Sequence, residues 1–552
     1  MTNSGHNVYI RLFLIGKKCY ICKIKGKTLF QMTQTVRYPI GEQSFREIIR
    51  NGYVYVDKTM YIHKLVNENK YYFLSRPRRF GKSLLVTTME QYFIGNRELF
   101  QGLAIDRLEP EEWRRHAVLH LDLNGSIYAT ENNLLTQLSF HLDKWEKEYG
   151  CTVSTTQVDV RFRGIIESAF QKTGLGVVVL IDEYDKPVID ALDNHELEKA
   201  YRNILRGFYG VMKSCSDYLK FVFLTGVGKL GQINVFSGLN NIRDISLDSE
   251  YSGICGITTE ELLNNFKEGI EKMGRYNGWS YDQTVQELKK HYDGYHFAGD
   301  LNDVYNPYSL LNALQVSNLG SYWYATGTPT RLYEELNKWD FPLEDLEGIR
   351  VAPRTLETGD VLGNNLEVLF YYTGYLTIKQ QVKTNSGERY VLGYPNQEVR
   401  EAFFDGLVRL WTGMSDHRRD TWTDKFQDAI LGGDIDGFLT LMQSFLAGNS
   451  YRTNPDTEIH YQDLIYIISR LVGLNADVER ATSDGRIDMI LDTPKAIYII
   501  EFKLDKSPEE ALQQIEDKQY DRPYRVLGKP IVKVGVNIST TTRTIDSWLI
   551  RR

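Results

Sequence analysis

Residues 71–85 combine the residue types that bind phosphate. A short apolar run leads into a loop that ends in Gly81-Lys82-Ser83, and a helical pattern follows. In a P-loop of this layout the backbone N–H groups and the helix N-terminus face the phosphates, a lysine reaches the β- and γ-phosphate oxygens, and a hydroxyl binds Mg²⁺. We therefore expect an ATP·Mg²⁺ site with Ser83 as a metal ligand. The predicted cofactor-binding residues of this loop are Arg79, Phe80, Gly81, Lys82, Ser83 and Leu84.

Two acidic residues follow a second apolar run. Residues 177–181 are five consecutive apolar residues, which predicts a strand buried on both faces of a parallel sheet. Asp182 and Glu183 come directly after it, at the carboxyl end where open α/β sheets bind ligands. We expect Asp182 to hold Mg²⁺ through water and Glu183 to polarise the attacking water. A buried strand followed by a solvated turn is the alternative.

A third predicted strand, residues 219–224, ends at Thr225. In ATPases of this layout a polar residue at that place senses the γ-phosphate, so Thr225 is a predicted cofactor-binding residue. Farther along the chain, Arg243 is a candidate for reaching the γ-phosphate of a neighbouring subunit in a homo-oligomer. A salt bridge with Asp244 or Asp248 is the alternative use of this arginine.

A second group of charged residues lies near the C-terminus. Residues 485–491 and 496–503 are predicted to form two strands of a hairpin, joined by a turn. Side chains alternate along a strand, so Glu501 and Lys503 share one face. Charged groups on an otherwise buried strand are costly unless they have a function. Asp488, on the neighbouring strand, can meet Glu501.

These residues predict a second metal site. Two carboxylates together bind Mg²⁺, which prefers oxygen ligands. A bound metal lowers the pKa of a water molecule, and Lys503 can orient that water or neutralise charge on a phosphate. Glu458, at the start of an upstream helix, could add a carboxylate, and Glu479 is a weaker alternative. The predicted catalytic residues of the chain are Glu183, Asp488, Glu501 and Lys503, and the predicted metal ligands are Ser83, Asp182, Asp488, Glu501 and Glu458.

Four motifs in this chain resemble the AAA-ATPase-like proteins of bacteria. They are Val56-Asp57-Lys58-Thr59, Arg76-Pro77-Arg78-Arg79-Phe80-Gly81-Lys82-Ser83, Ile181-Asp182-Glu183-Tyr184-Asp185 and Leu224-Thr225-Gly226. The resemblance covers nearly the whole chain from about Met32, and in that family a P-loop domain is commonly joined to a C-terminal PD-(D/E)XK nuclease-like domain. Arg76 stands where the general P-loop pattern has its first glycine, but the Arg-Pro-Arg-Arg-Phe loop is itself typical of the family.

The resemblance extends to the C-terminal residues. Asp488, Glu501 and Lys503 match the Asp…Glu-x-Lys pattern of the PD-(D/E)XK nucleases, which implies metal-dependent cleavage of phosphodiester bonds. The segment 511–515 resembles the family's Ala-Leu-x-Gln-Ile segment and implies that Gln514 points toward the site. A degenerate nuclease fold that is kept for structure is the alternative.

The order of the apolar patterns predicts an α/β protein. Strands alternate with helices in the first part of the chain, which indicates a P-loop NTPase with a parallel sheet and helices on both faces. A helical, winged-helix-like connector is expected next, with a DNA-docking module as the alternative, and then a C-terminal α/β nuclease-like domain. The predicted boundaries are 1–31 for a non-native extension before a natural start at Met32, 32–255 for the ATPase core, 256–395 for a lid and connector, and 396–552 for a helical segment and the nuclease-like domain.

Individual elements follow from the same patterns. Apolar residues at helical spacing predict helices over 134–149, 162–173, 195–213, 258–277 and 281–292, a helix that starts at Asn306-Pro307, and an all-helical stretch over 398–447. Short apolar runs predict strands at 53–56, 118–123, 368–372 and 390–392.

The composition limits the possible functions. The chain carries 65 basic and 72 acidic residues, a net charge of −7, so any DNA contact must come from a local patch. Five cysteines, with a lone Cys19-x-x-Cys22 pair, indicate neither a zinc site nor a disulfide framework and are typical of the reducing cytoplasm. No apolar run approaches the roughly 18 residues that are needed to span a bilayer.

These patterns predict a cytoplasmic, ATP-binding ATPase whose nucleotide state gates or positions a Mg²⁺-dependent nuclease acting on DNA. A homo-oligomer is compatible with them. The alternative is a nucleotide-switched binding or signalling protein with an inert nuclease-like scaffold. A helicase-like translocase is disfavoured because the sequence has no second motor core and no helicase motif set.

Overall fold

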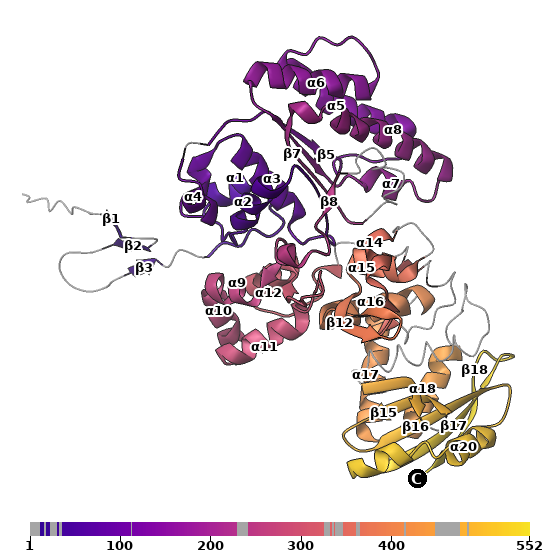
Figure 1. The fold of residues 1–552 in the computed structure, drawn as a ribbon. Helices are drawn as coiled ribbons and strands as arrows, with labels where there is room; N and C mark the ends of the chain where they lie inside the picture. Colours follow the sequence, from indigo (N-terminus) through magenta and orange to yellow (C-terminus); the bar gives the residue numbers. More distant parts are fainter. Residues whose placement is uncertain are drawn as a thin grey trace, which may run out of the picture.

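In the computed structural model an α/β core is followed by a helical region, a small antiparallel sheet and a C-terminal mixed sheet (Figure 1). The structure describes residues 12–15, 18–21, 30–32, 36–111, 113–228, 241–324, 332–333, 336, 346–359, 365–412, 416–447, 475–482 and 485–552. The first of these residues form their own antiparallel sheet of β1 (Leu12–Ile15), β2 (Lys18–Ile21) and β3 (Phe30–Met32).

The core sheet is parallel, with the strand order β5-β6-β7-β4-β8. Its strands are β4 (Tyr71–Ser75), β5 (Val118–Asp122), β6 (Val177–Asp182), β7 (Leu219–Gly226) and β8 (Arg243–Asp244). Every residue of β6 is buried, as expected for a strand rich in Val and Ile that is covered on both faces. Only β7 separates β4, which leads into the P-loop, from β6, which leads into the acidic pair. The two motifs therefore meet at one edge of the sheet.

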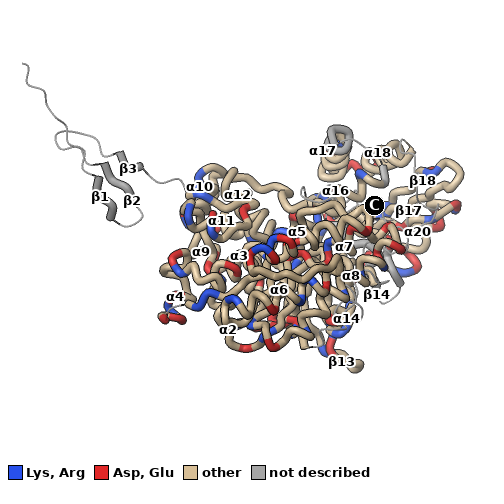
Figure 2. The backbone as a smooth tube through the Cα atoms, turned by 90° about the horizontal axis from the view of Figure 1, so that it is seen from above, with Lys and Arg blue, Asp and Glu red and all other residues tan. Residues whose placement is uncertain are grey.

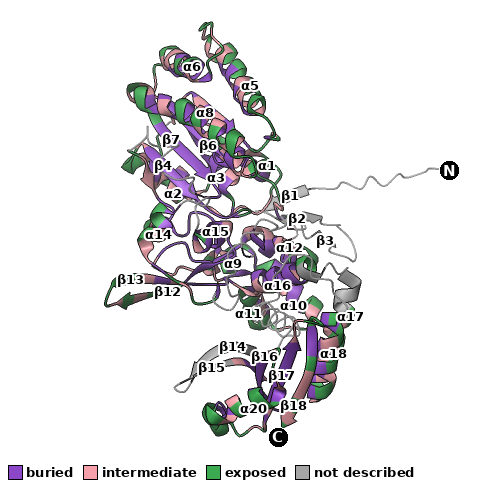
Figure 3. Ribbon diagram, turned by 90° about the vertical axis from the view of Figure 1, so that its right-hand side faces the viewer, coloured by how far each residue is buried: buried purple, intermediate pink, exposed green. Residues whose placement is uncertain are grey.

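Helices cover both faces of this sheet (Figure 3). Val178 and Leu180 of β6 pack in a core that includes α3, whereas Val179 and Ile181 pack in a second core with α5, α6 and α8. The helices of this region are α1 (Phe45–Arg50), α2 (Thr59–Glu68), α3 (Lys82–Phe93), α4 (Ala104–Leu108), α5 (Glu131–Tyr149), α6 (Val158–Thr173), α7 (Lys186–Asp190) and α8 (His195–Ser214). This confirms the predicted P-loop NTPase fold. Residues 53–56 belong to no strand, so that predicted strand is wrong.

A helical region follows the core sheet. It contains β9 (Ile257–Thr258), α9 (Thr259–Asn265), α10 (Lys267–Asn277), α11 (Tyr281–Tyr292), β10 (Val304–Tyr305) and α12 (Pro307–Val316). The helix predicted over 258–277 is divided at Phe266, which ends α9 and precedes α10. Asn306 caps α12 as predicted, because its side chain accepts the N–H of Ser309.

The next region contains a small antiparallel sheet with the order β11-β13-β12. Its elements are β11 (Arg350–Val351), α14 (Pro353–Thr358), α15 (Leu366–Thr373), β12 (Thr377–Thr384) and β13 (Gly387–Gly393). The strand predicted over 368–372 is wrong, because these residues lie in the buried helix α15. A short continuous apolar run suits a helix buried on all sides as well as a strand, and periodicity does not separate the two.

Three helices lead to the C-terminal domain, as predicted for residues 398–447: α16 (Gln397–Thr412), α17 (Asp416–Gly432) and α18 (Ile435–Ala447). The domain consists of β14 (Asn475–Thr482), β15 (Gly485–Asp492), β16 (Ile497–Leu504), α20 (Pro508–Asp517), β17 (Ile531–Ser539) and β18 (Thr544–Arg551) in strand order β14-β15-β16-β17-β18. The predicted hairpin is present as β15 and β16, and α20 connects β16 to the parallel strand β17. In the described part of the chain no helix has the length and apolar character to cross a membrane.

Candidate nucleotide-binding and metal-binding sites

The loop between β4 and α3 has the backbone shape of a phosphate cradle. Gly81 caps α3 with a φ of 94°, and Arg79 has a φ of 69°, so two residues of the loop occupy the left-handed region. A Cβ at Gly81 would meet no atom within 4 Å, so the backbone conformation rather than a lack of space favours glycine there. The N–H groups of the first helical turn need partners from outside the helix, and an anion can supply them.

Lys82 connects this loop to the acidic motif. The residue is 4% exposed, its Nζ atom donates to the carbonyl of Pro77 (3.3 Å), and the same atom lies 3.4 Å from Oε1 of Glu183. Glu183 itself has a φ of 53°, a conformation that non-glycine residues adopt rarely and that is often found at functional sites. The structure thus brings together the predicted phosphate lysine and the predicted water-polarising carboxylate.

The two predicted magnesium ligands of this site lie close enough for Ser83 to influence the pKa of Asp182. Burial raises the pKa of Asp182 to about 6, the charge of Glu183 adds to the rise, and a hydrogen bond with Ser83 opposes it. A hydroxyl and a carboxylate that already meet at the end of the P-loop provide the oxygen ligands that Mg²⁺ prefers. These residues therefore fit the metal.

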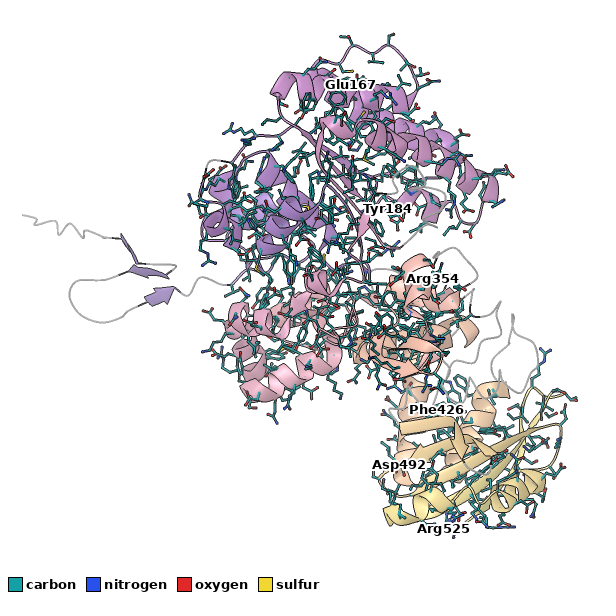
Figure 4. The ribbon with its side chains drawn as sticks, in the orientation of Figure 1. Glu167, Tyr184, Arg354, Phe426, Asp492 and Arg525 are labelled. Atoms are coloured by element: carbon teal, nitrogen blue, oxygen red, sulfur yellow. The ribbon has the colours of Figure 1, made fainter. Side chains whose placement is uncertain are left out.

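Asp185 is a buried residue of the acidic motif that we did not predict as a site residue. It is 0% exposed, and its Oδ2 atom accepts the N–H groups of Val227 and Gly228, both at 2.9 Å. Tyr184, labelled in Figure 4, lies beside it in sequence and is also fully buried, with its N–H on the carbonyl of Thr225 (3.0 Å). These bonds join the turn after β6 to the end of β7. A third carboxylate, two positions after Glu183 and close to a buried strand, is the sequence signal that could have revealed Asp185.

Arg76, which replaces the usual first glycine, is a structural residue of the interior. It is 1% exposed and donates to the carbonyls of Ser75 (2.8 Å), Ser246 (2.7 Å) and Tyr251 (3.1 Å). Its guanidinium group lies 4.3 Å from the centre of the Phe297 ring. The arginine therefore anchors the start of the loop, and its two terminal nitrogens donate to main-chain carbonyls.

The P-loop opens onto a cleft of about 1360 Å³, its mouth included. Its lining includes four basic side chains, Arg78, Arg79, Lys82 and Lys186, and two acidic ones, Glu42 and Glu183. The predicted residues Ser83, Gly81 and Leu84 also line the cleft, whereas Asp182 and Thr225 do not. The hydroxyl of Thr225 is buried and has no hydrogen-bond partner among the described residues. The excess of positive charge suits a polyphosphate.

A hollow with mainly apolar walls adjoins this cleft, with a volume of about 610 Å³ that includes the open solvent at its mouth. The two share Pro39, Gly81, Leu84, Pro307 and Leu311. Phe80, a predicted cofactor-binding residue, lines the hollow rather than the cleft. Its ring lies 4.7 Å from the Tyr295 ring and 5.2 Å from the Phe297 ring, measured between centroids. A hollow with mainly apolar walls beside a cationic cleft fits a nucleotide base beside its phosphates.

The C-terminal hairpin assembles the second predicted site. Met489 pairs with Ile500, so the next position along the ladder brings Asp488 beside Glu501. Asp488 Oδ2 accepts the N–H of Phe502 (2.8 Å), and Glu501 Oε1 accepts Lys503 Nζ (3.1 Å). The three predicted side chains are therefore adjacent.

Glu501 is the most buried of these groups. It is 0% exposed, and burial, followed by the charge of Asp488, raises its pKa to about 7. Gln514 of α20 donates to Oε1 of Glu501, as the resemblance implied, whereas Oε2 has no hydrogen-bond partner among the described residues. A buried carboxylate oxygen without a partner beside a second carboxylate fits a divalent metal ion.

Other predicted residues have different outcomes. Glu458 lies outside the described residues, as does the side chain of Glu479. Arg243 bonds to Glu68 and Asp248 (2.8 Å each), which agrees with the salt-bridge alternative rather than with a free arginine. Within the described ranges, no group of three or more His, Cys, Asp or Glu residues is gathered closely enough to hold a metal ion. Among the residues that the structure describes, each proposed site has two predicted protein ligands, Ser83 with Asp182 and Asp488 with Glu501.

Comparison with known proteins gives matches in both parts of the chain. Residues 39–236 match the family described as "Predicted AAA-ATPase", and residues 456–548 match the "PD-(D/E)XK nuclease superfamily". A curated relative from Azotobacter chroococcum mcd 1, "Uncharacterized protein in vnfD 5'region", is 36% identical over 526 residues, which cover 93% of this chain and 98% of the relative. The similarity thus spans both regions and the segment between them.

Proposed function

The chain belongs to the bacterial AAA-ATPase-like family with a C-terminal PD-(D/E)XK nuclease domain, and from this premise we propose that it hydrolyses ATP and uses its nucleotide state to control Mg²⁺-dependent cleavage of DNA. It is proposed to act in the cytoplasm. The proposal includes the catalytic activity of both sites and the control of the nuclease site by the nucleotide site.

The ATPase half of the proposal is supported by the contact between Lys82 and Glu183, which both line one cationic cleft. Lys82 would move from Glu183 to the β- and γ-phosphate oxygens, which frees the glutamate to orient and polarise water. Ser83 and Asp182 would hold Mg²⁺, which supplies charge neutralisation for the phosphates. Thr225, at the end of the strand between them, is proposed to sense the γ-phosphate.

The nuclease half rests on the adjacent carboxylates of Asp488 and Glu501. They would hold Mg²⁺, which supplies a water of lowered pKa. Lys503, whose Nζ lies 3.1 Å from Glu501, would orient this water or balance the charge of the phosphate. Gln514 fixes the orientation of the Glu501 carboxylate through its amide.

DNA is proposed as the substrate, through a local contact surface. Lys and Arg are mixed with Asp and Glu along the part of the backbone that Figure 2 colours, in agreement with a net charge of −7. Such a chain lacks the general positive field that attracts nucleic acid at long range. The contacts with the backbone phosphates must therefore lie close to the C-terminal site.

One observation favours the alternative function, a nucleotide-switched binding or signalling protein with an inert nuclease-like scaffold. Glu501 is 0% exposed, so its carboxylate has to become accessible before it can hold a metal that also contacts DNA. In an inert scaffold the same carboxylate would stay in its hydrogen bonds with Lys503 and Gln514.

A cleavage assay on the full chain separates these functions. Plasmid, linear and single-stranded DNA are incubated with the protein, with and without ATP, in Mg²⁺ or Mn²⁺, and ATP binding and ATP turnover are measured in parallel. The proposal expects metal-dependent cleavage whose rate changes with ATP. ATP binding without cleavage of any substrate would favour the alternative, and an absence of ATP binding would contradict both.

A further inference from the structure

A tryptophan that lies far from the P-loop in the sequence makes a hydrogen bond with it. The indole Nε1 of Trp323 donates to the carbonyl of Arg78 (3.1 Å), in the middle of the loop. Next to this bond, Pro77 packs against Gly374, where a Cβ would lie only 2.7 Å from Pro77 Cβ and where φ is 89°. Residues that precede and follow α15 in the sequence therefore contact the loop.

The main chain of Trp323 is bound to a buried carboxylate. Its N–H donates to Oε1 of Glu398 (2.8 Å), and the hydroxyl of Ser309 donates to the same oxygen (3.0 Å). Glu398 is 2% exposed and lies in the first turn of α16. One oxygen atom thus joins α12, the Trp323 turn and α16.

Helix α12, which carries Ser309, also borders the nucleotide cleft. Pro307, Tyr308 and Leu311 line the cleft, and the guanidinium of Arg79 lies 4.9 Å from the centre of the Tyr308 ring. The connection from the P-loop to Glu398 therefore has two branches. One passes through Arg78 and Trp323, and the other passes through the stacked Arg79 and α12.

Aromatic packing reinforces the contact with α16. The rings of Trp323 and Tyr375 are 5.1 Å apart, and those of Tyr375 and Phe403 are 5.6 Å apart. Phe403 is fully buried on α16. Because close-packed interiors transmit displacements rather than absorb them, a shift of the Trp323 ring must be shared with α16.

Helix α16 leads to the C-terminal sheet through α17 and α18 (Figure 1). Gln443 of α18 donates to the carbonyl of Ile545 (2.7 Å), and the indole of Trp548 donates to Asp436 (2.9 Å). Both bonds attach α18 to β18, the strand that pairs with β17 beside the Glu501 strand. Three consecutive helices therefore span the distance between the two candidate sites.

We propose that Trp323 and Glu398 are positioning residues that transmit nucleotide occupancy of the P-loop to helix α16, and through it regulate the C-terminal site. The inference rests on the proposed binding of ATP. The N–H of a buried indole is costly to leave without an acceptor, so Trp323 follows the Arg78 carbonyl when phosphate rearranges the loop. Glu398 then has to follow the main-chain N–H of Trp323, because its own burial makes the loss of that donor costly.

Hydrogen–deuterium exchange of the full chain, with and without a non-hydrolysable ATP analogue and Mg²⁺, tests this directly. In the wild type the analogue should lower the hydrogen-exchange rate of residues 76–83 by at least about threefold. It should also change the exchange rate of residues 397–412 by at least about threefold. No change in 76–83 would refute nucleotide binding and hence the proposed function. A change in 76–83 with none in 397–412 would overturn the inference alone.

Variants then identify the residues responsible. Trp323→Phe keeps an aromatic ring and the second branch but loses the N–H, so it should keep the effect in 76–83 while weakening the effect in 397–412. Trp113→Phe is the matched control, because its indole also donates to a main-chain carbonyl, that of Glu109 (3.2 Å), away from the P-loop. It should behave as the wild type. If residues 397–412 of Trp323→Phe respond to the analogue as strongly as those of the wild type, the indole N–H takes no part in the transmission.

Glu398 is tested by a pair of substitutions. Glu398→Gln keeps an oxygen that accepts both hydrogen bonds, so the exchange of residues 397–412 should respond to the analogue as in the wild type. In Glu398→Ala the exchange of these residues should no longer respond to the analogue. Wild-type coupling in Glu398→Ala, with 76–83 still responding, would show that the carboxylate does not transmit the change. The wild-type measurement stands by itself should Glu398→Ala fail to fold.

Discussion

The carboxylate of Asp185 occupies the space that a side chain at position 226 would need. A Cβ built on Gly226 would overlap with Oδ1 of Asp185, whose Oδ2 already accepts the N–H groups of Val227 and Gly228. The end of β7 and the turn that carries Glu183 are therefore fitted to each other through a buried carboxylate.

Gly226→Ala should accordingly destabilise the fold by about 1–3 kcal/mol, the usual cost of adding a methyl group to a filled interior. It should also slow ATP hydrolysis, because the displaced Asp185 shifts Glu183 relative to Lys82. Urea denaturation and ATP turnover measure the two effects. Gly207→Ala is the control, since a Cβ at this position in α8 meets nothing within 4 Å. An unchanged midpoint for Gly226→Ala would contradict the overlap.

Lys82→Ala should lose nucleotide binding. The ammonium group makes charge-assisted hydrogen bonds to phosphate in the proposed complex, each worth roughly 1.5–3 kcal/mol, which corresponds to about 10- to 100-fold in affinity. Titration with a fluorescent ATP analogue measures the change. Lys144→Ala, at an exposed position on α5, is the matched control. Equal affinity in Lys82→Ala and the wild type would remove Lys82 from the phosphate site.

Arg76→Ala should unfold at a lower urea concentration than the wild type. The change removes the donors to three main-chain carbonyls and the stacking on Phe297, so we expect a loss of at least about 3 kcal/mol. Arg107→Ala, at an exposed position on α4, should change stability by less than about 0.5 kcal/mol. A stable Arg76→Ala variant that still binds ATP would contradict the anchoring role.

Local patterns were sufficient to predict which residues the two candidate sites bring together. Glycine and lysine at the start of a helix, an acidic pair after a buried strand, and Glu501 and Lys503 on one face of a strand are all defined by residues that are neighbours in sequence. Their contacts with one another, such as that of Lys82 with Glu183, followed because parallel strands end at a common edge.

Contacts between distant segments could not be predicted in this way. Nothing near Trp323 in the sequence indicates that its indole meets Arg78, or that Glu398 accepts its main-chain N–H. The strand prediction for residues 368–372 was wrong for a related reason. The helix from Leu366 to Thr373 is buried on all sides, so it has no polar face to show whether its period is that of a helix or of a strand.

Glu501→Ala should abolish DNA cleavage while ATP binding survives. Gln514→Ala should have a smaller effect, roughly the 10- to 100-fold that is typical when a partner of a metal ligand is lost, because the amide only orients the carboxylate. Glu509→Ala, at an exposed position in the first turn of α20, should cleave as the wild type does. The readouts are the initial rate of plasmid cleavage and the affinity for an ATP analogue. Wild-type cleavage by Glu501→Ala would exclude the C-terminal site as the catalytic centre.

Metal binding at the C-terminal site should depend on pH through Glu501. Burial and the charge of Asp488 raise the pKa of Glu501 to about 7, so below that pH the carboxylic acid must release a proton before it can bind a divalent ion. The affinity for Mn²⁺ should therefore rise by up to about tenfold for each pH unit below the pKa and become constant above it.

Calorimetric titration of the nucleotide-free protein with Mn²⁺ at several pH values, in buffers of different ionisation enthalpy, measures both the affinity and the protons released. We expect release of close to one proton below the pKa and almost none well above it. Glu501→Gln, which has no proton to lose at this position, should bind Mn²⁺ weakly and with no such pH dependence. A wild-type affinity that stays constant between pH values of about 5.5 and 7 would mean that Glu501 is already ionised or that it does not bind the metal.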